Sequence, residues 1–128
     1  MGPRKRAADK ARQSWNSIPH GYGQCEADAM ALRALMKELS PEAHKRGCEL
    51  TETAFAIRAL AKALHEHPEF NSHMDEDGKG MTLKRSCDIG VALTVGHAVI
   101  VPVIREVQKK DLWPVAVELS KLPVRARE

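Results

Sequence analysis

The side chains best suited to chemistry in this sequence are two histidines beside turn residues. His20 follows an Ile-Pro pair, and His97 follows Gly96 within a short apolar stretch. An imidazole can accept or donate a proton near neutral pH, so each histidine is a candidate general base. The simpler interpretations are a hydrogen-bonded turn residue for His20 and an exposed turn residue for His97, and the residues alone favour these.

A second group of histidines has residue types that could bind a metal. His65, His67, His73 and Asp75 form the pattern H-x-H-x5-H-x-D. Histidines two apart diverge on a helix, whereas a metal needs ligands that converge on one point. The sequence therefore predicts a solvated helix end here, and no metal site.

The three cysteines indicate a reducing compartment. Cys25, Cys48 and Cys87 are odd in number and widely spaced, with no C-x-x-C pair. This usage predicts free thiols and a cytoplasmic location. A thiol nucleophile at Cys25 or Cys87 would need an activating neighbour, and none is evident. Both are therefore expected to be small buried hydrophobic residues.

Composition restricts the broad class of protein. The chain has 128 residues, of which 43% are hydrophobic but only 4% aromatic, so its core must be aliphatic. The net charge of +3 is mild and dispersed, which does not favour a nucleic-acid-binding domain. No apolar run reaches the roughly 20 residues of a membrane span, and no apolar segment of a secretory signal follows the basic start.

Four helices are expected from apolar periodicity and capping residues. Two of them have clear N-cap residues, Asp28 and Thr51, and a third follows Asp111 with Pro114 in its first turn. A polar connector is expected to separate the second helix from the third. The expected helices cover residues 4–15, 29–39, 52–67 and the stretch after 111.

Short strands are expected between the last two helices. A strand over Met81–Arg85 follows an Asp-Gly turn, and two apolar strands joined by a Gly-containing turn follow Cys87. Their unbroken Val, Ile and Ala runs predict burial on both faces. Another short strand is expected at Tyr22–Glu26. The predicted fold is α/β, with helices packed on one face of a small mixed sheet.

The ordered motifs are similar to those of a known family. Its acyltransferase domain has the patterns S…IPH, E-x-D…L…R, LT…F-x-I-x-A, P-x-x-N, IG-A…VPVIR and a final L…AR helix. This chain matches them in order over practically its whole length, and it resembles the acyltransferase domain of 2-oxoacid dehydrogenase complexes. The matching positions include Ser14, Ile18-Pro19-His20, Glu26, Asp28, Arg33, Leu50-Thr51, Phe55, Pro68, Asn71, Pro102, Ala126 and Arg127.

The resemblance implies a fold similar to that of chloramphenicol acetyltransferase, in trimers that assemble into larger cores. It implies acyl transfer between CoA and a lipoyl thiol in a channel between subunits, with a histidine as base. The family's catalytic H-x-x-x-D-G motif is absent from these 128 residues. We therefore expect residues 1–128 to form a single truncated acyltransferase-like domain, equivalent to the N-terminal half of the family domain.

The resemblance also suggests site residues. Arg4, Lys5 and Arg6 are candidates for the CoA phosphates or an acidic partner surface, and a solvated helix start is the alternative. Ser14 is a channel donor or a backbone cap. The candidate channel residues are Ser14, His20, Gly96, His97 and Pro102.

Three functional interpretations are compatible with these residues. In the first, the chain is a partial dihydrolipoyl acyltransferase-like module that serves in assembly and in acyl-CoA or partner binding. It would form a trimer-based homo-oligomer or pair with a complementary acyltransferase subunit, without membrane or metal. In the second, it is a working acyltransferase whose catalytic residues come from a partner chain or from His20 or His97. A nucleic-acid-binding domain is the third and least favoured.

Overall fold

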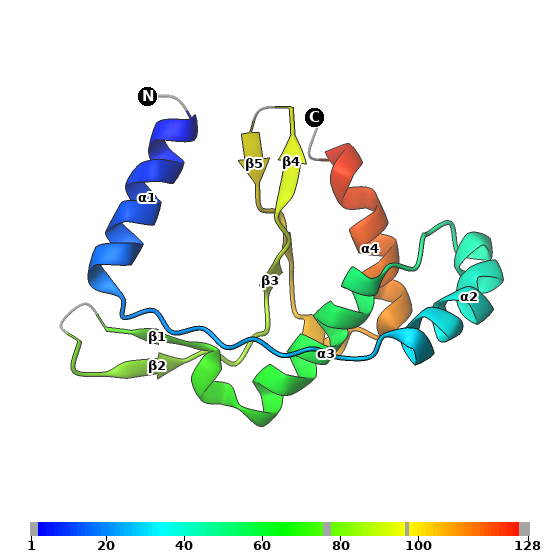
Figure 1. The fold of residues 1–128 in the computed structure, drawn as a ribbon, viewed down its shortest axis with the longest axis horizontal. Helices are drawn as coiled ribbons and strands as arrows, with labels where there is room; N and C mark the ends of the chain where they lie inside the picture. The colour runs from blue at the N-terminus through cyan, green and yellow to red at the C-terminus, as the bar shows by residue number, and fades with distance from the viewer. Residues whose placement is uncertain (1–2, 76–77, 97, 126–128) are drawn as a thin grey trace.

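A computed structural model describes residues 3–75, 78–96 and 98–125 (Figure 1). It has an α/β fold, which confirms the predicted class. Its helices are α1 (Pro3–Ser17), α2 (Met30–Lys45), α3 (Glu52–Glu66) and α4 (Leu112–Arg125), with short 3₁₀ turns η1 (Pro68–Phe70) and η2 (Val107–Lys109). Over these described ranges, none of the helices is long and apolar enough to cross a membrane.

The strands form three antiparallel pairs. β1 (Ser72–Met74) pairs with β2 (Met81–Leu83), β3 (Ile89–Gly90) with β6 (Val103–Ile104), and β4 (Leu93–Val95) with β5 (Ala98–Ile100). The expected strand at 81–85 is therefore present in a shorter form, with a partner that periodicity did not reveal. Within the described residues these are separate two-stranded pairs rather than one mixed sheet.

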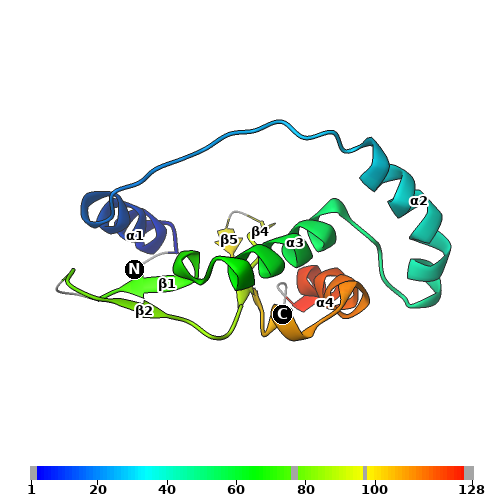
Figure 2. The ribbon, with the colours of Figure 1, turned by 90° about the horizontal axis from the view of Figure 1, so that it is seen from below.

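The first helix stands apart from the rest of the chain. Residues 18–29 run from α1 to α2 as a long stretch that passes at a distance from α3 (Figure 2). The strand expected at Tyr22–Glu26 does not form, and this prediction was wrong. No described strand pairs with this stretch, and the Tyr22 side chain is 98% exposed. Cys25 is exposed too, which corrects the expectation that it is buried.

Helix α2 is longer than its periodicity suggested. It continues through Pro41 to Lys45, so the connector predicted for this stretch is in fact helical. The prediction of Asp28 as the N-cap was wrong, because Ala29 occupies that position. Asp28 Oδ1 still accepts a hydrogen bond from Met30 N at 2.8 Å at the start of the helix. Burial of Ala43 explains the extension, because packing offsets the cost of an internal proline.

Helices α3 and α4 form the centre of the molecule. The predicted cap of α3 is confirmed, because Thr51 accepts a hydrogen bond from Ala54 N at 3.4 Å. The main cluster joins both helices to the strand pair β3–β6 and to Cys87. Its buried members are Ile57, Ala61, Cys87, Ile89, Ile104, Val107, Val115 and Leu122. A second cluster holds α2 against α4 through Ala43, Cys48, Leu50, Ala54 and Ala116.

The β4–β5 hairpin projects from this centre between α1 and α4 (Figure 1). Burial on both faces was predicted here, and this is wrong for several residues. Val99 is 65% exposed, Val101 57% and Val103 43%. The apolar run is present as expected, but within the described chain one of its faces has no covering layer.

Candidate functional site

The two predicted channel residues near the N-terminus lie at the end of α1. Ser14 is half-buried within the helix, and its carbonyl accepts a hydrogen bond from Ile18 N at 3.0 Å. His20 is exposed and stacks on Trp15, with 5.0 Å between the ring centroids. The stack on Trp15 does not decide between a turn residue and a channel residue, so the role of His20 stays a prediction.

The other predicted channel residues lie on the hairpin. Gly96 occupies the turn with a φ of 58°, a conformation that glycine adopts without steric cost. Pro102 joins β5 to β6, and its carbonyl accepts a hydrogen bond from Val91 N at 2.9 Å. Pro102 also lines a hollow of about 510 Å³ together with Arg105 and Arg125. His97 lies outside the described residues.

The basic start of α1 faces solvent. Lys5 and Arg6 are exposed and form no ion pair with any residue the structure describes, and the side chain of Arg4 lies outside its description. Among the described residues, no hydrogen bond, ion pair or ring contact joins α1 to the β4–β5 hairpin. The structure therefore does not bring Ser14 and His20 together with Gly96 and Pro102 within one chain.

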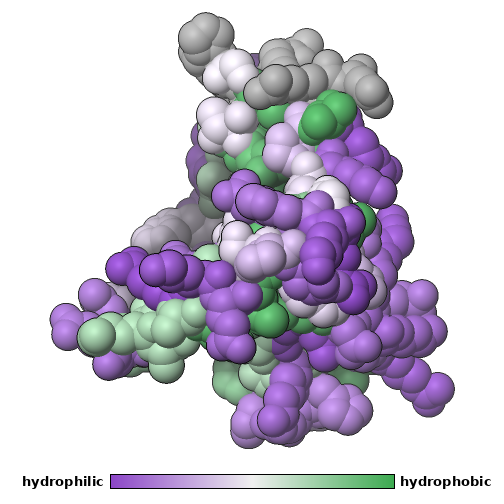
Figure 3. Space-filling model, turned by 90° about the vertical axis from the view of Figure 1, so that its right-hand side faces the viewer, coloured by the Kyte–Doolittle hydropathy of each residue, from purple (hydrophilic) through white to green (hydrophobic). Residues whose placement is uncertain are grey.

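A large cleft lies elsewhere, between α2 on one side and α4 with the β3–β4 segment on the other. Its volume is about 980 Å³. The apolar wall is made by Met36, Leu50, Val91, Leu93, Leu119 and Pro123. The side of the molecule that carries α2 and α4 is mostly hydrophilic, with hydrophobic residues visible between the polar ones (Figure 3). A cleft of this size, apolar with polar groups at its margin, is typical of a small-molecule site.

Lys37, Ser40 and His44 lie at helical spacing along the α2 wall of the cleft. Neither Lys37 nor His44 forms an ion pair with a described residue, so both are available to a ligand. Ser120 on the α4 wall is already engaged, because its Oγ accepts from Glu49 N at 3.1 Å and donates to Ala116 O at 2.9 Å.

The described lining of the cleft offers groups that can bind a ligand. The Cys48 thiol at its edge is buried and donates to the carbonyl of Ala43 at 3.5 Å. Across the described residues that line it, no hydrogen bond links a nucleophile to a base. What the cleft offers is apolar surface, hydroxyl groups and two basic side chains.

Sequence reasoning missed this cleft for an identifiable reason. The second helix was expected to end at residue 39, before Ser40 and His44. Extending the helix past Pro41 places them on the same stripe as Lys37. The i, i+3, i+7 spacing of these polar residues was the available signal.

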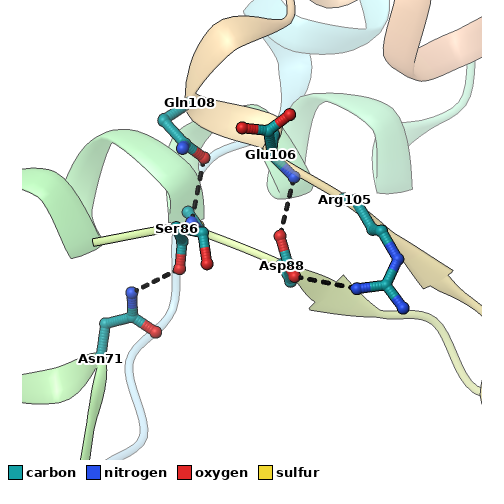
Figure 4. A network of polar contacts seen from close by, with 7 residues as sticks. Asn71, Ser86, Asp88, Arg105, Glu106 and Gln108 are labelled. Carbon is teal, nitrogen blue, oxygen red and sulfur yellow. Dashed lines mark hydrogen bonds and ion pairs between the residues drawn. The ribbon is translucent and has the colours of Figure 1, made fainter. Parts of the chain in front are cut away.

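A polar network fixes the segments that flank β3 (Figure 4). Asp88 Oδ1 accepts a hydrogen bond from Glu106 N at 2.8 Å, and Asp88 Oδ2 pairs with Arg105 at 3.4 Å. Glu106 has a left-handed φ of 50°, which is unfavourable for a residue with a Cβ atom. The Asp88 carboxylate therefore holds the chain in the turn that follows β6.

The Cys87 thiol next to this network is buried. Burial, and then the negative charge of Asp88, raise the pKa of the Cys87 thiol above its usual value. Cys87 is 5% exposed and packs in the main cluster, as the sequence predicted. Its role is structural.

The histidines of the H-x-H-x5-H-x-D pattern do not gather. His67 faces Glu69 at 3.6 Å, while Asp75 accepts a hydrogen bond from Thr82 Oγ1 at 3.3 Å within the β1–β2 hairpin. No group of three or more metal-ligating side chains occurs in residues 3–75, 78–96 and 98–125.

Comparison with known proteins establishes the class to which this fold belongs. Residues 1–128 match the family described as 2-oxoacid dehydrogenases acyltransferase (catalytic domain). A solved structure described as the cubic core of the pyruvate dehydrogenase multienzyme complex superposes with a TM-score of 0.94 and 32% identity, over 98% of this chain and 51% of that one. The chain therefore belongs to this acyltransferase family, as the ordered motifs suggested.

Curated relatives agree with this assignment. The acetyltransferase component of the Haemophilus influenzae pyruvate dehydrogenase complex is 36% identical over 91% of this chain and 21% of its own length. The lipoamide acyltransferase component of the Pseudomonas aeruginosa branched-chain alpha-keto acid dehydrogenase complex is 30% identical over 99% of this chain and 30% of its own. The chain thus spans under a third of these relatives and about half of the solved core.

Proposed function

We propose that this chain is a dihydrolipoyl acyltransferase-like module that binds acyl-CoA in the cleft between α2 and α4 and works as part of an assembly. The single observation that carries the proposal is the 980 Å³ cleft, with apolar walls and with Lys37 and His44 on α2, neither of which forms an ion pair with a described residue. Acyl-CoA combines an extended, partly apolar arm with phosphates, so it suits a cleft with this distribution of groups.

The exposed apolar surface supports assembly. Val99 on the hairpin, Val101 just after it, and Trp15 and Ile18 at the end of α1 are each more than half exposed. Apolar side chains gathered on strand edges usually mark a surface that another chain covers. A homo-oligomer built on trimers is the proposed assembly, and a complementary acyltransferase subunit is the alternative partner. A cytoplasmic location is proposed from the three free cysteines.

Within an assembly, the channel residues proposed from sequence acquire a role. Ser14 and His20 lie apart from Gly96 and Pro102 in one chain, so a channel that includes all four needs a second chain. His97 belongs to the same proposal by its position after Gly96. Lys5 and Arg6, with Arg4, remain a second candidate for the CoA phosphates because they form the basic start of an exposed helix.

Calorimetric titration of acetyl-CoA into the purified chain tests the binding proposal. Lys37→Glu reverses a charge in the cleft, and Lys45→Glu makes the same change on α2 outside the cleft. We expect saturable binding that weakens at least about tenfold in Lys37→Glu, equivalent to about 1.4 kcal/mol, and less than about twofold in the control. Equal weakening in both variants, or no saturable binding, contradicts the cleft assignment.

The basic start of α1 is tested in the same titration. A Lys5→Gln, Arg6→Gln double variant that weakens acetyl-CoA binding while Lys37→Glu does not would move the phosphate site from the cleft to α1. Sedimentation velocity tests assembly separately. A stable monomer at micromolar concentration contradicts the homo-oligomer.

A further inference from the structure

A second pocket, separate from the cleft, lies where the end of α3 meets the segment that follows β2. Its volume is about 570 Å³. The α3 side contributes His65, and the opposite side contributes Lys84 and Arg85. Asn71, Cys87 and Gln108 form part of its inner wall. None of these residues lines the cleft between α2 and α4, so the pocket and the cleft do not share a wall residue.

The charged groups that line this pocket share one sign. Lys84 and Arg85 are exposed and adjacent, and no aspartate or glutamate is among the lining residues that the structure describes. Neither cation forms an ion pair with a described residue. Lys110, a cation elsewhere in the chain, differs from Lys84 and Arg85 because it forms an ion pair with Glu118.

The backbone that carries the two cations is held from both sides. Asn71 Nδ2 donates to the carbonyls of Lys84 and Ser86, both at 3.1 Å, and Lys84 N donates to Asn71 O at 2.8 Å. On the other side, Gln108 Oε1 accepts from Cys87 N at 2.9 Å. Figure 4 shows Asn71 and Gln108 reaching this segment from two different elements. The bases of the cationic side chains are thus fixed at the pocket.

Lys84 and Arg85 both line the pocket, so an anion bound there would be attracted by two positive charges. Arginine offers a planar fork of donors that matches a phosphate, and lysine adds a compact charge with three donors. The His65 imidazole on the facing wall can add a further hydrogen bond. The combination is that of a site for a phosphate group.

We propose that this pocket binds a phosphate group through Lys84 and Arg85, with His65 completing the site. The phosphate is either a free ion or the terminal group of a small phosphomonoester. The pocket is larger than a phosphate ion alone needs, so it has room for the group attached to an ester.

The proposal is tested by amide chemical-shift titration of the isotope-labelled chain at constant ionic strength, with inorganic phosphate and with adenosine monophosphate as probes. We expect saturable shifts at the amides of Arg85 and Cys87. Arg85→Gln should weaken the apparent affinity at least about fivefold. Lys10→Gln, which removes one charge from α1, should leave it unchanged. A circular dichroism spectrum confirms that each variant is folded.

The possible outcomes are distinct. Tighter binding of adenosine monophosphate identifies a phosphomonoester site, and equal binding identifies a site for the free ion. Linear shifts spread over basic residues, equal affinity in Arg85→Gln and Lys10→Gln, or shifts centred on Lys37 instead of Arg85 would each overturn the proposal. Because Lys37 belongs to the acyl-CoA cleft, failure of one site is distinguishable from failure of the other.

Discussion

Replacing Asp88 by alanine removes the acceptor that holds the turn after β6. The Asp88 carboxylate accepts the Glu106 amide at 2.8 Å, and Glu106 keeps a left-handed φ of 50°. Loss of a hydrogen bond to a charged group costs about 2 kcal/mol of unfolding free energy. The Arg105 ion pair adds little, because the Arg105 side chain is 77% exposed. We expect Asp88→Ala to destabilise the chain by about 2 kcal/mol.

Urea unfolding followed by circular dichroism measures this change. For a denaturant slope of roughly 1.5 kcal/mol per molar, the midpoint should fall by about 1.3 M. Arg105→Ala is the matched control, since it removes only the exposed ion pair, and its midpoint should fall by less than about 0.3 M. If Asp88→Ala and Arg105→Ala shift the midpoint equally, the hydrogen bond to Glu106 does not stabilise the turn and the reasoning is refuted.

Four further predictions concern the same fold. Glu106→Asn should raise the unfolding free energy by about 0.5–1 kcal/mol in urea titrations, because asparagine tolerates the left-handed conformation; a loss of stability would contradict it. Thr51→Ala should cost about 1 kcal/mol by removing the N-cap of α3, and an unchanged urea midpoint would show that the cap is dispensable. In alkylation followed by mass spectrometry at pH 8, exposed Cys25 should react before buried Cys87. Because the pKa of Cys87 is raised in the folded chain, its protonated form favours folding, and stability should fall as pH rises above the usual thiol pKa; stability that rises over that range would contradict the shift.

Local signals in the sequence predicted much of the helical framework. Thr51 was recognised as an N-cap because its side chain can satisfy an unpaired amide at a helix start, and the structure confirms the bond. The last helix was expected after Asp111, and its buried residues Val115 and Leu122 lie seven positions apart, on one face of α4.

Other features depend on partners that periodicity cannot show. Helix α2 passes through Pro41 because packing of Ala43 against α4 outweighs the local cost, and a local pattern contains no such information. Val99 has the sequence character of a buried strand residue, yet it is exposed in this chain. Its burial is decided by what covers the hairpin.

The candidate site shows the same division. The family was readable from ordered motifs, and the family match over residues 1–128 confirms it. The α2–α4 cleft could not be predicted from the sequence. Lys37, Ser40 and His44 lie on one face of α2 only because the helix continues to Lys45, past the predicted end at residue 39. The candidates Ser14, His20, Gly96, His97 and Pro102 came from the resemblance, and their proposed meeting in a channel requires a second chain.

The most direct test of the proposed function is acyl transfer from acetyl-CoA to dihydrolipoamide by the purified chain, followed by chromatography of the thioester product. We predict that these 128 residues bind acetyl-CoA saturably with no turnover above the buffer rate, since across the described residues that line the cleft no hydrogen bond links a nucleophile to a base. Turnover that is lost in His20→Ala or in His97→Ala would contradict this prediction, and would make the chain a working acyltransferase with a relocated base.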